Sequence, residues 1–147
     1  MSIKSKYNSK VKVIVSSNKS SLNMLTTNAA DLRSKTKCLK DLIKLFDISI
    51  FSIQETHFKK KGRLTLENFA IFEAIRKKDG GGSMLGINVA LQPVLISEYS
   101  DTFELIVTEI LAAGKYIRVI TGYGPQETWD LDMKMKFFIA LENSNRK

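Results

Sequence analysis

Two polar residues, Asn28 and Glu55, stand where two short predicted strands end, and together they could bind a metal ion. One predicted helix joins the two strands, which favours a right-handed crossover between parallel neighbours. Parallel strands end at the same edge of a sheet, where α/β proteins bind ligands. A carboxylate and an amide oxygen suit a hard cation such as Mg²⁺. The alternative is that Asn28 caps the next turn and Glu55 is a solvated residue at a strand end.

A second group of candidates lies in residues 121–126, with the sequence Thr-Gly-Tyr-Gly-Pro-Gln. A strand is expected to end at Tyr123, because Pro125 cannot continue it. The glycines on either side of the tyrosine let the backbone approach a ligand or turn sharply. The hydroxyl of Tyr123 could then hydrogen-bond a phosphate. An ordinary strand end with a structural tyrosine is the alternative interpretation.

Three other features favour structural roles. The glycine run 80–82 is followed by a predicted strand, whereas a phosphate-binding loop must open a helix, so a hairpin turn is expected. Cys38 lies in the predicted helix beside Leu39 and is expected to be a packing residue. His57 comes two residues after Glu55 and would share its side of an extended chain. It could be a second ligand or a general base, although a lone loop histidine usually has no such role.

Two basic clusters could bind the backbone of a nucleic acid. One follows the Glu55 strand and the other precedes the glycine run: Lys59, Lys60, Lys61 and Arg63, then Arg76, Lys77 and Lys78. Lysine and arginine neutralise phosphates without reading the base sequence. The alternative is that both clusters are solvated loops.

The elements that must position these residues change in kind along the chain. A strand over 22–28, a helix with Ser34 as its expected N-cap, and a buried strand over 48–53 come first. Strands over 69–75, 83–91, 94–98, 103–111 and 116–123 then suggest an antiparallel meander, followed by a helix over 129–143. This order predicts a mixed α/β (α+β) fold with a second sheet layer.

The composition of the chain excludes several classes of function. The chain has 147 residues and a formal net charge of +8, which points mildly toward polyanionic partners. No apolar run reaches the roughly 18–20 residues that span a bilayer, so no membrane association is expected. One cysteine and one histidine exclude an internal disulfide and a zinc cluster, which favours an intracellular protein. Residues 1–21, rich in lysine and serine, are expected to form a flexible basic leader before a domain over 22–147.

Several of these segments resemble the endonuclease/exonuclease/phosphatase family. The resemblance is carried by five segments: residues 27–32 with Lys35, residues 48–56 with Gln54-Glu55-Thr56, residues 80–88 with the glycine run, residues 104–109, and residues 117–126 with their Tyr-Gly-Pro junction. It is most similar to the apurinic-type endonuclease domains of non-LTR retrotransposons. The resemblance implies a four-layered α/β sandwich and hydrolysis of phosphodiester or phosphomonoester bonds with Mg²⁺ or Mn²⁺ and no organic cofactor. The full-length relative would nick DNA. Glu55 would then be the metal carboxylate, and Asn28 its neighbour in the metal and phosphate shell. Tyr123 would contact the scissile phosphate or order the network of the active site.

The chain also departs from that family pattern. Ala30 stands where the family often has an acidic residue, and Asp31 comes one position later. The family's later Asp-X-Asn, metal-binding Asp and Ser-Asp-His motifs are not present before Lys147. We therefore expect a truncated N-terminal half, catalytically incomplete, whose partners would be DNA and a missing C-terminal half or reverse transcriptase domain, with a nuclear location if functional. A non-enzymatic nucleic-acid-binding remnant and a phosphatase acting on inositol phosphates or lipid head groups are the alternatives.

Overall fold

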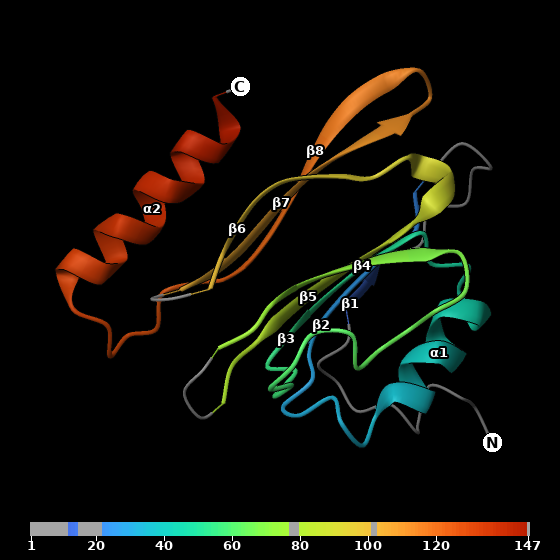
Figure 1. The fold of residues 1–147 in the computed structure, drawn as a ribbon, viewed down its shortest axis with the longest axis horizontal. Coiled ribbons are helices and arrows are strands. Elements are labelled where there is room, and N and C mark those ends of the chain that lie inside the picture. The colour runs from blue at the N-terminus through green and yellow to red at the C-terminus, as the bar shows by residue number, and fades with distance from the viewer. Residues whose placement is uncertain (1–11, 15–21, 77–79, 101–102, 147) are drawn as a thin grey trace.

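The protein folds as two β-sheets lying face to face between two helices (Figure 1). The computed structural model describes residues 12–14, 22–76, 80–100 and 103–146. The elements are β1 (Lys12–Ile14), β2 (Met24–Asn28), α1 (Thr36–Leu45), β3 (Ile50–Gln54), β4 (Phe69–Ala74), β5 (Ser83–Asn88), the 3₁₀ helix η2 (Val89–Leu91), β6 (Val94–Tyr99), β7 (Glu104–Ala112), β8 (Lys115–Tyr123) and α2 (Leu131–Asn145). The first sheet has the order β1-β2-β3-β5-β4 and the second the order β6-β7-β8.

The predicted unit of strand, helix and strand is present. β2 and β3 are parallel neighbours, with Asn28 opposite Gln54, and α1 connects them. The helix buries Leu39, Leu42 and Ile43, the apolar face that the spacing indicated. The predicted N-cap is wrong: Lys35 occupies that position without a side-chain cap bond. The chain turns just before the helix, where Lys35 N donates to Leu32 O, and this turn places Ser34 one residue too early to cap.

The predicted meander is divided between the two sheets. Antiparallel strands β4 and β5 complete the first sheet, and β6, β7 and β8 form the second. The strand expected over 83–91 ends at Asn88, because the Asn88 side chain accepts a hydrogen bond from Ala90 N and caps η2. Gln92 then adopts a left-handed conformation before Pro93, so the chain leaves one sheet and enters the other.

One strand lies within the segment predicted to be a flexible leader. Lys12–Ile14 forms β1, which pairs antiparallel with β2 at the edge of the first sheet. The rest of residues 1–21 lies outside the described part of the chain.

Apolar side chains fill all three spaces between the four layers. Phe51 and Ile53 pack with α1, Ile50 and Leu85 pack with β7 between the sheets, and Leu105 and Val107 pack with α2. Burying each such side chain contributes about 1.5–3 kcal/mol. Cys38 packs against the first of these clusters, which confirms its predicted packing role.

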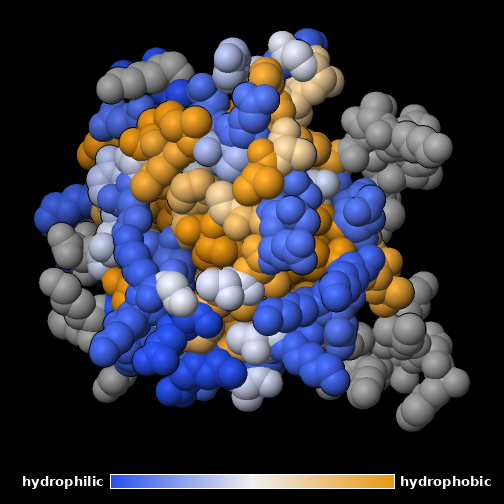
Figure 2. Space-filling view, turned by 45° about the vertical axis from the view of Figure 1, so that its right-hand side comes forward, coloured by the Kyte–Doolittle hydropathy of each residue, from blue (hydrophilic) through white to orange (hydrophobic). Residues whose placement is uncertain are grey.

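The side of α2 turned away from the second sheet is apolar as well. Its buried residues are Phe137, Ala140 and Ser144, while an opposite stripe is at least half exposed: Leu131, Met135, Phe138 and Ile139. Figure 2 shows another feature of the surface, a broad band of hydrophobic side chains bordered by hydrophilic ones on the face drawn there. Contiguous apolar surface of this kind commonly marks an interaction site. Within the described residues, no helix is long and apolar enough to cross a membrane.

Candidate active site

The ends of β2 and β3 form one continuous edge, as the parallel crossover predicted. Pairing continues past the strands, since Ala29 N donates to Gln54 O and Asp31 N donates to Glu55 O, each at 2.9 Å. The backbone that carries Asn28 therefore lies beside the backbone that carries Glu55. The sequence correctly predicted that these two residues share an edge of the sheet.

On its other side, the loop after β3 is bound to the glycine run. Thr56 N donates to Gly82 O at 3.1 Å and His57 N donates to Gly81 O at 2.9 Å. Glu55 and His57 both have positive φ angles, 55° and 58°. Non-glycine residues adopt this conformation only where the surrounding structure enforces it, often at functional sites. The chain is thus not extended here, so the expectation that alternation puts His57 on the same side as Glu55 does not apply.

Tyr123 joins the second sheet to this edge. Its hydroxyl donates to Glu55 Oε1 at 2.7 Å and accepts from Gln126 Nε2 at 2.8 Å. The Glu55 carboxylate and partial burial raise the pKa of Tyr123, while Gln126 and the positive charge of Arg76 oppose that shift. Tyr123 is therefore a neutral phenol, able to donate, at physiological pH. The structure therefore brings Glu55 and Tyr123, two of the three predicted catalytic residues, into contact across the two sheets.

A buried ion pair lies behind Tyr123. Glu104 is 1% exposed, accepts a hydrogen bond from Gly82 N at 2.8 Å and forms an ion pair with Arg76, whose Nε lies 2.9 Å from Glu104 Oε1. The Arg76 guanidinium carbon in turn lies 5.7 Å from the centre of the Tyr123 ring, within the range of a cation–π contact. Ser83 Oγ adds a longer contact of 3.4 Å to Glu104 Oε2.

The glycine run is a hairpin connection, as predicted, and it is also packed into this site. A Cβ at Gly81 would lie 2.7 Å from both Arg76 Nε and Glu104 Oε1. A Cβ at Gly82 would lie 2.5 Å from Thr56 Oγ1. Only glycine leaves room for the arginine and the carboxylate beside the backbone.

Sequence reasoning missed Glu104 as a site residue. The available signal was an acidic residue at the start of an otherwise apolar strand, Glu-Leu-Ile-Val, where a solvated position would be the usual expectation. The sequence also did not reveal a hydrogen-bonded group of polar side chains that links the two sheets near the site. Ser52 and Thr121 share a hydrogen bond between their hydroxyls, and Gln54 Nε2 donates to Ser52 Oγ at 2.9 Å.

Asn28 is exposed and binds its own loop. Its Oδ1 accepts from Ala30 N at 2.9 Å, which is the turn-capping role held open as the alternative. Among the described residues, its Nδ2 donates no hydrogen bond. Asp31, the acid one position late, forms a bidentate ion pair with Arg33. This pairing holds the pKa of Asp31 far below its ordinary value.

The donor set suits Mg²⁺ in kind. Within the described ranges, no three histidine, cysteine or acidic side chains are grouped so that they could hold a metal ion. Mg²⁺ keeps several of its waters and is usually held by one or two carboxylates with substrate phosphate. The Glu55 carboxylate at this edge fits that pattern. The described side chains do not fit a zinc site, in which the protein itself supplies most of the ligands.

The residues of the two predicted basic clusters differ in their exposure and in their ion pairs. Lys59, Lys60 and Arg63 are exposed on the loop after β3. Lys61 forms an ion pair with Glu98 at 2.7 Å. Arg76 belongs to the buried pair with Glu104 rather than to an exposed patch. Lys77 and Lys78 lie outside the described residues.

Comparison with known proteins places the fold. No family model and no curated protein matches the sequence. The structure is similar to the endonuclease domain of TRAS1, a telomere-specific non-LTR retrotransposon, with 14% identity and a TM-score of 0.62 over 85% of this chain and 54% of that one. It is also similar to the AP endonuclease LMAP of Leishmania major, with 14% identity and a TM-score of 0.61 over 99% of this chain and 50% of that one.

A third similar structure is the 3′ phosphatase NExo from Neisseria bound to a product DNA hairpin, with 16% identity and a TM-score of 0.60 over 86% of this chain and 52% of that one. These similarities define the fold as the sandwich of endonuclease/exonuclease/phosphatase proteins, which confirms the predicted fold class. This chain spans about half the length of the structures that it resembles.

Proposed function

We propose that this chain is part of a divalent-metal-dependent phosphodiesterase domain that acts on DNA, of the type found in non-LTR retrotransposons. The observation that carries the proposal is the hydrogen bond from Tyr123 to Glu55, which joins the two sheets at the edge where β2 and β3 end. The similarity to the TRAS1 endonuclease domain supports the retrotransposon type. A DNA substrate would place the protein in the nucleus.

Each site residue has a role that follows from its chemistry. The Glu55 carboxylate would hold Mg²⁺ or Mn²⁺, which when bound polarises a phosphate oxygen and offsets charge that develops during hydrolysis. The amide of Asn28 would lie in the shell of the metal and phosphate. Tyr123 has a single O–H, which would turn from Glu55 to a phosphate oxygen when the carboxylate binds the metal. Arg76, fixed by Glu104, adds a positive charge behind the tyrosine ring.

We infer that catalysis requires protein surface beyond these residues. Phosphodiester hydrolysis also needs a group that orients the attacking water and donors that stabilise the developing charge. The chain spans about half the length of the similar structures, and the apolar stripe on α2 has no partner among the described residues. A C-terminal half of the sandwich would cover that stripe and supply the missing groups.

The test combines metal binding with DNA nicking. Glu55→Gln keeps an oxygen that can accept from Tyr123 but removes the negative charge, and Glu67→Gln is the control because Glu67 is an exposed glutamate in a loop. We expect electron paramagnetic resonance to show Mn²⁺ binding to the chain and to Glu67→Gln, and its loss in Glu55→Gln. We expect little or no nicking of supercoiled plasmid by the chain alone.

The outcomes separate the interpretations. Absence of Mn²⁺ binding in the unaltered, folded chain would contradict the proposal. Mg²⁺-dependent nicking that Glu55→Gln abolishes would support the proposed chemistry and show that this chain needs no further segment. Activity on inositol phosphates or lipid head groups without activity on DNA would instead favour the phosphatase alternative.

A second candidate function is nucleic-acid binding without catalysis. It is favoured by the exposed Lys59, Lys60 and Arg63 and by the net charge of +8. DNA binding that weakens with salt, but is unaffected by EDTA and by Glu55→Gln, would support it.

A further inference from the structure

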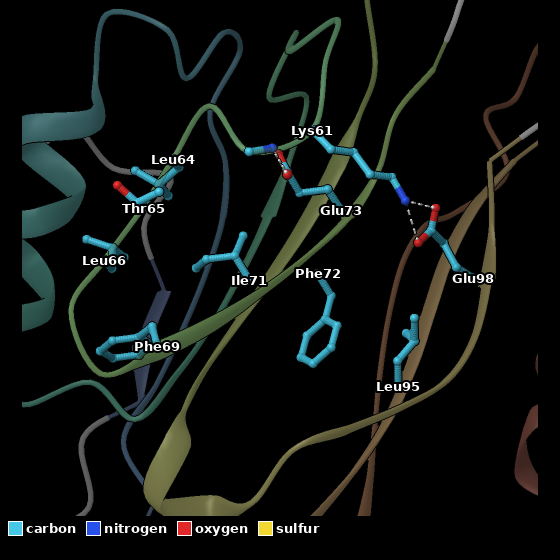
Figure 3. Close-up of a pocket in the computed structure, with 11 residues that line it drawn as sticks. Lys61, Leu64, Thr65, Leu66, Phe69, Ile71, Phe72, Glu73, Leu95 and Glu98 are labelled. Atoms are coloured by element: carbon cyan, nitrogen blue, oxygen red, sulfur yellow. Dashed lines mark hydrogen bonds and ion pairs between the residues drawn. The ribbon is translucent and has the colours of Figure 1, made fainter.

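An open groove lies at the free edge of β4, away from the candidate active site. Its volume is about 580 Å³, within the roughly 300–1,000 Å³ typical of small-molecule sites. β4 is the last strand of the first sheet, and β6 of the second sheet forms the opposite wall. Figure 3 shows the main lining side chains, which come from the 61–66 loop, β4 and β6: Leu66, Phe69, Ile71, Phe72, Glu73 and Leu95.

One carboxylate in this groove is only half satisfied. Glu73 is 6% exposed, and its Oε2 accepts from Gly62 N at 2.7 Å. Its Oε1 is buried and has no hydrogen-bond partner among the described residues. Leaving such an oxygen unpaired is unfavourable in free energy, and more so for a charged group. A ligand that donates to this oxygen would recover that free energy.

The charges around Glu73 indicate which donor would fit. Lys61 is engaged by Glu98, to which it donates at 2.7 and 2.8 Å, so this acid and base largely neutralise each other. Among the residues that the structure describes, the donor to Glu73 is a backbone N–H, and burial raises the pKa of Glu73 although the charge of Lys61 opposes that shift. The groove therefore combines an apolar wall with an acid that forms no ion pair of its own within the described ranges.

We propose that this groove binds a small organic amine, with its protonated nitrogen on Glu73 Oε1 and an aryl or alkyl body against Phe72 and Leu95. A protonated amine supplies both the missing hydrogen bond and the missing positive charge. The apolar body displaces water from side chains that are partly exposed, Leu95 by 42%. None of the residues assigned to the metal and phosphate shell lines the groove, so this proposal stands or falls independently of the proposed function.

The experiment uses two probes of nearly the same shape, 4-methylbenzylamine and 4-methylbenzyl alcohol. Both are titrated into methyl-labelled protein, and the NMR shifts of Leu66, Ile71 and Leu95 are followed. The amine should bind about tenfold more tightly than the alcohol, as expected for a hydrogen bond to a charged group. Glu73→Gln should remove this preference, and Glu67→Gln, an exposed acid in the same loop that does not line the groove, should retain it.

A second variant keeps the test decisive if Glu73→Gln does not fold. Leu95→Trp fills the groove from an exposed position on β6 and should abolish the shifts with both probes. Equal binding of amine and alcohol would overturn the proposal. So would equal losses in Glu73→Gln and Glu67→Gln, since these would reflect general attraction to negative charge, and so would unchanged binding to Leu95→Trp.

Discussion

Two edges of the sandwich each contain a buried glutamate, and the two carboxylates differ in how many partners surround them. At the candidate active site, Glu104 is 1% exposed, accepts a hydrogen bond from a backbone N–H and forms an ion pair with Arg76. At the groove, Glu73 is 6% exposed and accepts a hydrogen bond from one backbone N–H, while its other oxygen has no partner in the part of the chain that the structure describes. The carboxylate of Glu104 is thus bound by groups of the protein itself, whereas one oxygen of Glu73 could still accept a hydrogen bond.

The difference shows that burial alone does not say what a carboxylate does. A buried charge is stable where a cation and donors surround it. Glu104 meets that condition and holds Arg76 in place behind Tyr123, so its role is structural and positional. Glu73 does not meet it, and a buried oxygen without a donor requires a specific explanation, which a bound ligand would supply.

The largest expected effect comes from removing Glu104. In Glu104→Ala, Arg76 and Gly82 N lose their buried partner, and breaking such a pair typically costs about 3–5 kcal/mol. The free energy of unfolding should fall by that amount in urea titrations. Glu104→Gln keeps an acceptor for Gly82 N and should lose less. A loss below about 1 kcal/mol for Glu104→Ala would mean that the pair contributes little.

Gly82 and Gly62 allow the space for a side chain to be compared between the two edges. Gly82 N donates to Glu104 and Gly62 N donates to Glu73, and their φ angles are 89° and 79°. Both Ala variants pay about 1–2 kcal/mol for a left-handed conformation. Gly82→Ala should lose about 1–3 kcal/mol more, since its Cβ would lie 2.5 Å from Thr56 Oγ1, while nothing lies within 4 Å at Gly62. Equal losses in thermal unfolding would contradict this contrast.

The pH dependence of stability should reveal Glu73. Burial raises its pKa above the ordinary value of 4.5, so the folded state retains a proton that the unfolded state has released. The stabilisation is complete below pH 4.5 and is lost as the pH rises through the raised pKa of the folded state. Each unit of pKa difference corresponds to about 1.4 kcal/mol. Urea midpoints measured between pH 4 and 8 should fall less in Glu73→Gln than in the unaltered protein.

The smallest expected effect concerns the contact at the candidate active site itself. The Glu55 carboxylate raises the pKa of Tyr123 above 10.0. Glu55→Gln should therefore lower the pKa of Tyr123, with little loss of stability because the amide oxygen still accepts. Ring-labelled tyrosine NMR follows the phenol directly, and Tyr116, which is 75% exposed, serves as an internal control. An unchanged Tyr123 titration would show that the hydrogen bond to Glu55 is not populated in solution.

Much of the sandwich could be predicted from the sequence. Period-2 and helical apolar patterns located most strands and both helices, and the crossover placed Asn28 and Glu55 at one edge. The Tyr-Gly-Pro junction correctly marked the end of β8. The division of the meander at Asn88 was missed, because the strand pattern appeared to continue through the apolar residues 89–91. A side-chain cap on η2 ended it instead.

The sequence by itself determined the elements, their inward faces and the polar residues at strand ends, since these depend on periodicity and on local turn chemistry. Only the tertiary structure decided which charges meet. Arg76 is 28 residues from Glu104 in the chain and Tyr123 is 68 from Glu55, and no local pattern encodes such pairs. The same holds for Glu73, because the packing around a strand edge, and not the residue type, left one of its oxygens without a donor.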